Sequence, residues 1–143
     1  MKERVKIIQE SMVGTIGMIG RSVKIDTGKQ IKGQVIHVQI EMIGDSKGYI
    51  IMEMPESYGY EIANGMLMGM MTVNSLDDMC KSVLGEMCNM VSGGICTSLS
   101  QVGIISDIKP PVVDMRLEAL NGSKAFSIEE ADGKYINIFL IFT

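Results

Sequence analysis

The chain has 143 residues, of which 46% are apolar and 21% are charged, so it can bury one continuous core and we expect a single domain over residues 1–143. Its net charge is −4, no cluster of basic side chains is present and tryptophan is absent, which argues against nucleic-acid binding. No apolar run approaches the ~20 residues of a membrane span. The first residues also lack the apolar block of a signal peptide, and we therefore expect a cytoplasmic protein without membrane insertion.

The first part of the sequence predicts a helix followed by paired strands. Apolar residues at helical spacing predict a helix over residues 3–19. A short strand is expected at residues 23–25, and alternation of apolar and polar residues predicts a longer strand over residues 36–42. After a glycine-containing turn, residues 49–54 complete a hairpin. His37 falls on the polar side of the longer strand, and we expect it to be exposed rather than catalytic because no partner is evident.

A second helix is predicted from Ser57 to Met71, just after Pro55. It contains Glu61 and Asn64, an acid and an amide about one turn apart. It ends in a dense methionine tract at residues 66–71, for which core or helix–helix packing is the expected role. Contact with a second subunit or a partner protein is the alternative.

The third predicted helix starts at Asn74 or Ser75, extends to about Gln101, and has a narrow polar face. The members of this face fall within a sector of roughly 80° at ~100° per residue: Asp78, Ser82, Glu86, Asn89 and Gly93. Small groups flank the acid and the amide, which leaves room for another molecule to approach closely. The opposite side is expected to be buried and consists of Leu76, Met79, Cys80, Val83, Met87, Met90 and Val91.

The three cysteines, Cys80, Cys88 and Cys96, are expected to be buried thiols. All lie on the third predicted helix, where eight residues span ~12 Å, and that distance is too long for a disulfide. The single histidine, His37, is distant in sequence, and no C-x-x-C pair is present. We therefore predict no metal site.

The last part of the sequence predicts further strands. Pro110 and Pro111 exclude the interior of a helix or a central strand, so they belong to a connection. Asn121–Gly122 and Asp132–Gly133 are typical of two-residue hairpin turns. The three expected strands cover residues 112–120, 125–130 and 135–142. The last of them has apolar side chains on both faces and should be central or covered.

The order of these elements is helix, strands, helix, helix, strands. It predicts an α+β fold with a mostly antiparallel sheet and helices packed over it.

The third helix and its flanks resemble the signature of the CheC/CheX/FliY family of chemotaxis phosphatases, and most closely its CheX branch. The shared spacing is Ser82-x-x-x-Glu86-x-x-Asn89-x-x-x-Gly93. Flanking residues that also agree are Asn74, Leu76, Asp77, Gly85, Met90, Asp107, Ile108, Pro110, Pro111 and Val113. The resemblance is good over residues 69–113 and elsewhere extends only to the order of elements. It implies an internally duplicated α+β fold and, in the CheX branch, a homodimer whose sheets pair across subunits.

Two other segments match this signature only in part. Glu10 and Gly17 have the right spacing, but Val13 stands where the amide should be, so we expect this copy to be catalytically empty; chance spacing explains it equally well. Glu61 and Asn64 match the central pair but lack the preceding Leu-Asp sequence and the later glycine. We interpret them as a chance match.

The motif residues are poorly equipped to act alone, because the sequence offers no nucleophile–histidine pair, no close carboxylate dyad and no metal-ligand cluster. An amide can hold a water molecule, and a carboxylate can pair with a cation on a partner. The resemblance implies a phosphatase that acts on the aspartyl phosphate of a CheY-like response regulator, whose receiver domain supplies Mg²⁺ and a lysine. In that role Asn89 orients the attacking water and Glu86 engages the lysine.

The remaining motif residues would shape the contact with the receiver. Ser82 and Gly93 are small, and Asp78 would be a charge at the rim. No cofactor is expected on this chain itself. Two alternatives stay open: a non-catalytic adaptor that binds a receiver or a flagellar-switch-type partner, and a small-molecule-sensing dimer suggested only by the methionine-rich helices.

Overall fold

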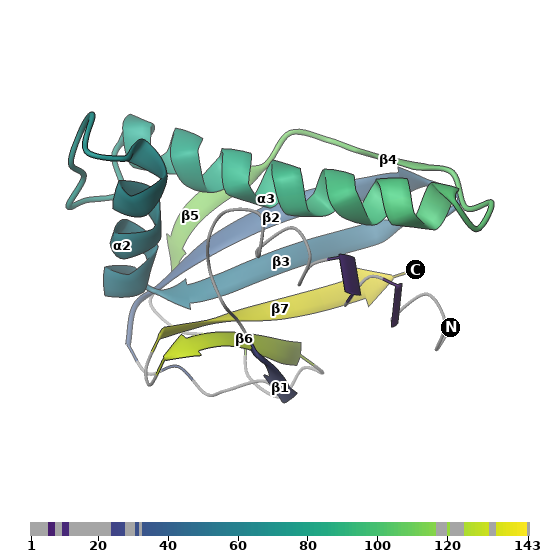
Figure 1. Ribbon diagram of the computed structural model, residues 1–143, viewed down its shortest axis with the longest axis horizontal. Helices are drawn as coiled ribbons and strands as arrows, with labels where there is room; N and C mark the ends of the chain where they lie inside the picture. The colour runs from purple at the N-terminus through teal and green to yellow at the C-terminus, as the bar shows by residue number, and fades with distance from the viewer. Residues whose placement is uncertain are drawn as a thin grey trace.

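Figure 1 shows the computed structural model, which describes residues 6–7, 10–11, 24–27, 31, 33–116, 120, 125–131 and 134–142. The described strands form one seven-stranded sheet in which every pairing is antiparallel. They are β1 (Lys24–Thr27), β2 (Val35–Gly44), β3 (Gly48–Pro55), β4 (Ser106–Ile108), β5 (Val112–Arg116), β6 (Ala125–Ala131) and β7 (Lys134–Phe142). Two described helices, α2 (Glu56–Leu67) and α3 (Asp78–Ser100), pack on one face of this sheet. The predicted α+β class is therefore confirmed.

The strand order is β1-β6-β7-β3-β2-β4, and β5 also pairs with β2. β7 lies between β6 and β3, as its two apolar faces predict. The hairpin predicted at Asp132–Gly133 is confirmed by the antiparallel pairing of β6 with β7, although the two turn residues lie outside the described part. The hairpin predicted at Asn121–Gly122 is wrong, because β5 pairs with β2 and not with β6. An Asn-Gly turn signal does not choose the partner of a strand, and here β5 joins the free edge of β2.

The core lies between the helices and one face of β2, β3 and β7. Alternation along a strand sends successive side chains to opposite faces, so every second residue of these strands enters the core. Its members from the strands are Ile36, Val38, Ile40, Met42, Ile50, Met52, Met54, Ile136 and Ile138. The helices contribute Tyr58, Ile62, Ala63, Cys80, Leu84, Met87, Cys88, Val91, Ile95 and Leu99. This packing fixes which face of α3 points away from the protein.

Helix α2 ends four residues before the predicted Met71. Met68 adopts a left-handed conformation with φ of 53°, and Gly69 follows with φ of 81°, so the helical hydrogen-bond pattern cannot continue. The side chain of Asn64 then holds the outgoing loop: its Nδ2 donates to the Val73 carbonyl at 2.9 Å, and its Oδ1 accepts from the Val73 N–H at 2.7 Å. Val73 is itself buried in the core. The loop between the two helices is therefore anchored at Val73, five residues before α3 begins.

Helix α3 begins later than predicted, at Asp78 rather than at Asn74 or Ser75. Asp77 caps it, since its Oδ1 accepts from the backbone N–H of Cys80 at 2.8 Å. The helix then continues without a break through Gly93 and Gly94 to Ser100. The glycine pair does not interrupt it because the helix is held along its length by core residues.

Residues 6–7 and 10–11 are helical, in agreement with the helix predicted over residues 3–19. The rest of that predicted helix, including Val13 and Gly17 of the partial motif, lies outside the described residues. Within the described part of the chain, no helix combines the length and the hydropathy needed to span a membrane.

Candidate functional site

The five predicted site residues all lie on the outer face of α3. Asp78, Ser82 and Glu86 are exposed, and Asn89 and Gly93 are half-buried. None belongs to the core, which takes the opposite side of the helix through Cys80, Leu84, Met87, Cys88, Val91 and Ile95. Because the helix is continuous, these five positions form one strip along its surface.

Glu86 and Asn89 form the centre of this strip. Three residues of helix separate them, a rise of ~4.5 Å, so the carboxylate and the amide can contact the same molecule. Among the described residues, neither side chain has a hydrogen bond or an ion pair. Thus the acid and the amide keep their donors and acceptors available to a partner.

Gly85, the residue before the acid, sets how closely α3 approaches the sheet edge. A Cβ placed on Gly85 would lie 3.1 Å from Cγ of Pro111 and 3.8 Å from Cγ2 of Val113. Pro111 belongs to the short connection between β4 and β5, the two strands that pair with different ends of β2. The bare glycine lets the helix rest directly on this connection, with Glu86 exposed just beside the contact.

Gly93, in contrast, is not crowded by the described part of the chain, since a Cβ placed there meets none of its atoms within 4 Å. The described residues therefore do not require a glycine at this position. Its small size is consistent with a surface that another protein approaches closely.

The cysteines of α3 are not nucleophiles in this structure. Cys80 and Cys88 are buried, as predicted, while Cys96 is only half-buried. Burial raises the pKa of Cys88 to about 12, and it also raises the pKa values of Cys80 and Cys96. A thiol with a raised pKa stays protonated near neutral pH and is a poor nucleophile. Among the described residues, no three His, Cys, Asp or Glu side chains gather into a metal-binding set.

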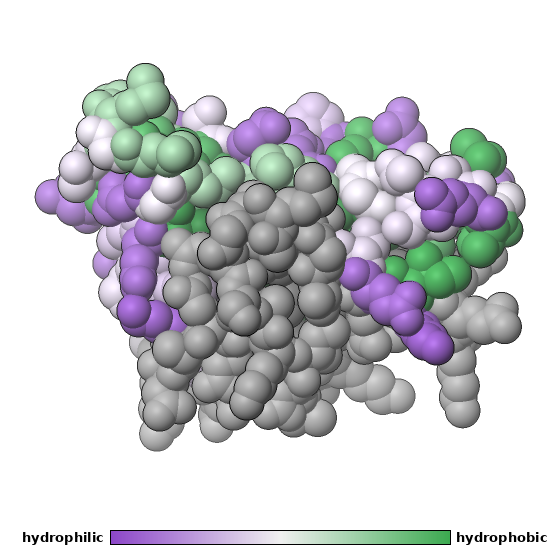
Figure 2. Space-filling model, in the orientation of Figure 1, coloured by the Kyte–Doolittle hydropathy of each residue, from purple (hydrophilic) through white to green (hydrophobic). Residues whose placement is uncertain are grey.

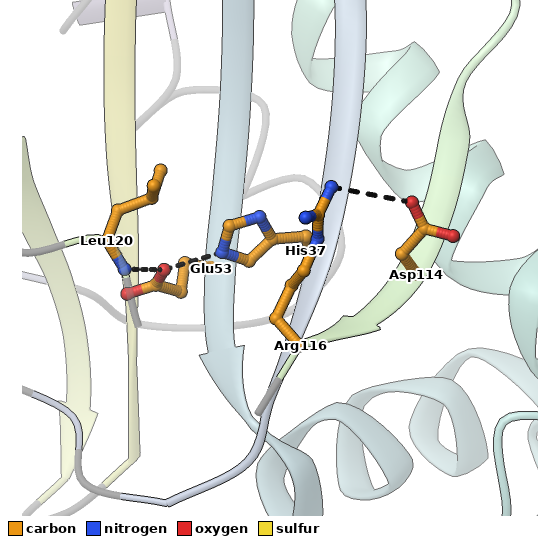
Figure 3. A network of polar contacts seen from close by, with 5 residues as sticks. All are labelled: His37, Glu53, Asp114, Arg116 and Leu120. Carbon is orange, nitrogen blue, oxygen red and sulfur yellow. Dashed lines mark hydrogen bonds and ion pairs between the residues drawn. The ribbon is translucent and has the colours of Figure 1, made fainter. Parts of the chain in front are cut away.

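The prediction that His37 is exposed is wrong. Its side chain is buried on the sheet face away from the helices, and Nε2 lies 2.6 Å from Oε2 of Glu53, which is fully buried (Figure 3). The same Glu53 oxygen accepts from the backbone N–H of Leu120 at 2.8 Å. Two neighbouring strands place these residues opposite each other in register. The sheet thus separates His37 from Glu86 and Asn89, and it cannot act with them.

The second acid–amide pair, Glu61 and Asn64 on α2, has partners inside the protein. Glu61 Oε1 accepts from Nζ of Lys134 at 2.9 Å. Asn64 holds the backbone of Val73, as described above. These contacts give Glu61 and Asn64 structural roles, in line with their interpretation as a chance match.

Two methionines of α3 lie on a different side of the helix from the one predicted. Met79 and Met90 were expected to be buried, but each is 38% exposed. With Val83, they form a stripe on the flank of the polar strip, because the three residues lie seven and three positions before Glu86 and four positions after it. The helical angles could have shown this, because both methionines lie closer to Glu86 than to the centre of the buried arc.

A hollow of about 290 Å³ lies at the other end of α3. Its lining residues are Ile7, Glu10, Ser11, Ser98, Gln101 and Val102. This volume is at the lower limit of typical small-molecule sites, and the hollow lies about three turns of helix beyond Asn89. It therefore does not belong to the candidate site.

Comparison with protein families identifies the chain. A family described as "Chemotaxis phosphatase CheX" matches residues 36–129, which run from the second residue of β2 into β6 and include the whole of α2 and α3. The protein belongs to the CheX family. A comparison with curated proteins gives no significant match.

Solved structures show the same fold. The CheX protein of Desulfovibrio desulfuricans superposes with a TM-score of 0.77 at 16% identity, covering 99% of both chains. CheX of Vibrio vulnificus gives a TM-score of 0.77 at 23% identity, covering 99% of this chain and 97% of the other. A Borrelia burgdorferi structure, a CheX–CheY–BeF₃–Mg²⁺ complex, gives a TM-score of 0.74 at 21% identity, covering 96% of each chain. At these identities the likeness establishes the fold.

Proposed function

We propose that this protein is a phosphatase that removes the aspartyl phosphate of a CheY-like response regulator. The observation that carries the proposal is the position of Glu86 and Asn89, which project from the outer face of an unbroken α3 without a partner among the described residues. Membership in the CheX family supports the reaction class. The Borrelia burgdorferi complex supports the choice of partner, since it joins a protein of this fold to CheY.

In the proposed reaction, α3 enters the phosphorylated site of the receiver domain. Asn89 holds a water molecule by accepting a hydrogen bond from it and donating one, and so orients the water for in-line attack. The water oxygen bonds to phosphorus while the bond between phosphorus and the aspartyl oxygen breaks, which releases inorganic phosphate and a free aspartate. The receiver contributes Mg²⁺ to offset the developing negative charge.

Glu86 supplies the electrostatic part of the contact. Its carboxylate is one helical turn from Asn89 and would pair with a lysine at the receiver's active site. Ser82 and Gly93 keep the approach close because they are small, and Asp78 adds a charge at the rim. An amide and an acid on this protein are then enough for hydrolysis, because the receiver supplies the metal and the reactive acyl phosphate.

The test is a phosphate-release assay with a phosphorylated CheY-like receiver. The unsubstituted protein should accelerate release, and Asn89→Ala should lower the rate about 100-fold or more because the water is no longer oriented. Binding to a receiver loaded with beryllofluoride and Mg²⁺, measured in parallel, should remain for this variant. A protein that binds the receiver but never accelerates release would be an adaptor, and one that does not bind it would leave only the sensor alternative.

A further inference from the structure

An unusual number of methionines is exposed around the candidate site. Met68, Met70 and Met71 of the α2–α3 loop are 85%, 87% and 50% exposed, and Met79 and Met90 of α3 are 38% exposed. We call these five residues the methionine collar. Apolar surface gathers over the α2–α3 loop at the upper left of Figure 2. The sequence predicts these side chains as packing residues, but the fold leaves them in water.

The loop part of the collar is held in this exposed arrangement. Met68 has φ of 53°, a left-handed conformation that disfavours a residue with a side chain. The loop leaves α2 with a hydrogen bond from the Met70 N–H to the Leu67 carbonyl at 3.0 Å, and two residues after Met71 the side chain of Asn64 holds the backbone of Val73. The backbone is therefore determined by the fold, while its methionine side chains contribute little to the core.

The helical part of the collar is continuous with the candidate site. Met79, Val83, Glu86 and Met90 fall within a sector of roughly 60°, and Glu86 lies ~10 Å along the helix from Met79 and ~6 Å from Met90. A stable protein interface buries about 800 Å² on each side, equivalent to a disc of roughly 16 Å radius. An interface centred on Glu86 and Asn89 must therefore cover both methionines. The loop lies just beyond the first turn of α3 and would reach its edge.

We propose, on the basis of the proposed function, that the methionine collar binds the apolar rim around the phosphorylated pocket of the receiver. The polar strip alone cannot exclude water from the contact, whereas apolar residues around a charged centre do so and strengthen its electrostatic interactions. Methionine suits this role because its flexible thioether chain adapts to an irregular surface. The expected partner surface is thus an acidic, lysine-bearing pocket with apolar side chains at its border.

The test uses the double variant Met79→Gln/Met90→Gln, because glutamine has a similar length and helix propensity but is polar. Each protein would be titrated with the receiver that the unsubstituted chain dephosphorylates, loaded with beryllofluoride and Mg²⁺. The dissociation constant and KM should rise about 10-fold or more, with kcat within about twofold.

Met68→Gln/Met70→Gln should give a smaller rise of about two- to fivefold in the dissociation constant, since the loop lies at the edge of the contact. Ile141→Gln, a 45% exposed apolar position on β7, is the control and should bind normally.

Unchanged affinity of the Met79→Gln/Met90→Gln variant would overturn the collar proposal. This outcome can be told apart from a failure of the proposed phosphatase function. If the phosphatase function were wrong, phosphate release with Asn89→Ala would be as fast as with the unsubstituted protein. If the Ile141→Gln control also lost affinity, the effect would not be specific to the collar, and the proposal would again be contradicted.

Discussion

Two helices of this protein carry an acid and an amide at the same spacing, and they use them differently. On α2, Glu61 pairs with Lys134 and Asn64 holds both backbone groups of Val73. On α3, Glu86 and Asn89 face outward without a partner among the described residues. The α2 pair supports the fold, whereas the α3 pair is available to another molecule.

The difference lies in what surrounds each pair. Asn64 is near the end of α2, where the chain turns back at Met68 and brings Val73 within hydrogen-bonding reach. Asn89 lies in the middle of a 23-residue helix, far from any turn, and its neighbours on the outer face are small or flexible. An acid and an amide three residues apart on a helix therefore do not define a site. The site depends on a continuous helix whose outer face is left uncovered.

After Asn89, the substitution with the largest expected effect is Glu86→Ala, which should weaken binding to the receiver. Glu86→Ala should weaken binding of the beryllofluoride-loaded receiver at least about 30-fold, because it leaves a lysine unpaired in a contact shielded from water. Glu61→Ala is the matched control and should bind with unchanged affinity. Equal affinity of the Glu86→Ala variant and the unsubstituted protein would remove the role assigned to this carboxylate.

Asn64→Ala should affect stability instead of chemistry. Its loss leaves the N–H and carbonyl of Val73 without their side-chain partners, and we expect the free energy of unfolding to fall by about 2 kcal/mol. Urea unfolding followed by circular dichroism would measure this change. Asn89→Ala, measured in the same way, should fall within about 0.5 kcal/mol of the unsubstituted protein. The reverse order of the two stabilities would contradict the roles given to them.

Substitutions at Gly85 and Gly93 of α3 should distinguish a glycine that the fold requires from one that binding requires. Gly93→Ala should stabilise the helix by about 0.5–1 kcal/mol, since a Cβ there meets no atom of the described residues within 4 Å. The same change should weaken receiver binding because it adds a methyl group to the contact surface. Gly85→Ala should gain less stability or lose some, because its Cβ would press against Pro111. Thermal unfolding and titration with the receiver, made on both variants, would check these expectations; Gly93→Ala with normal binding would exclude residue 93 from the contact.

The smallest effect concerns the ion pair on α2. Lys134→Ala should change the free energy of unfolding by less than about 0.5 kcal/mol, because both side chains of the pair are nearly half exposed and screened by water. Denaturant titration at low and high salt would measure it. A loss above about 1 kcal/mol would mean that Glu61 contributes more to the fold than an exposed pair can.

Most of the fold could be predicted from local patterns. Alternation identified β2 and β7, the turn after β2 placed β3 in a hairpin, Pro55 marked the start of α2, and helical spacing of apolar residues identified α3. Each of these elements contributes side chains to a common core. The partner of β5 could not be predicted, since an Asn-Gly turn signal carries no information about which edge a strand joins. His37 was placed on the correct face of β2, but its partner Glu53 lies on another strand and is also bonded by the distant Leu120 N–H, which its position in the sequence does not show.

The candidate site was predictable for a similar reason. Glu86 and Asn89 lie on the same helix, so their proximity follows from spacing alone. Met79 and Met90 were misplaced because methionine was taken as a core residue, whereas the buried arc of α3 is centred on Leu84, Val91 and Ile95. Both α2 and α3 carry an acid and an amide at this spacing. Only the contacts in the folded chain show that the pair on α3, and not the pair on α2, has no partner among the described residues.

The most direct test compares the two amides in one experiment. Asn89→Ala and Asn64→Ala would be assayed for release of phosphate from the same phosphorylated receiver at saturating concentration, with each rate referred to the fraction of folded protein. We predict that Asn64→Ala keeps the rate of the unsubstituted protein and that Asn89→Ala loses about 100-fold or more. An Asn89→Ala variant that releases phosphate as fast as the unsubstituted protein would contradict the proposed role of α3.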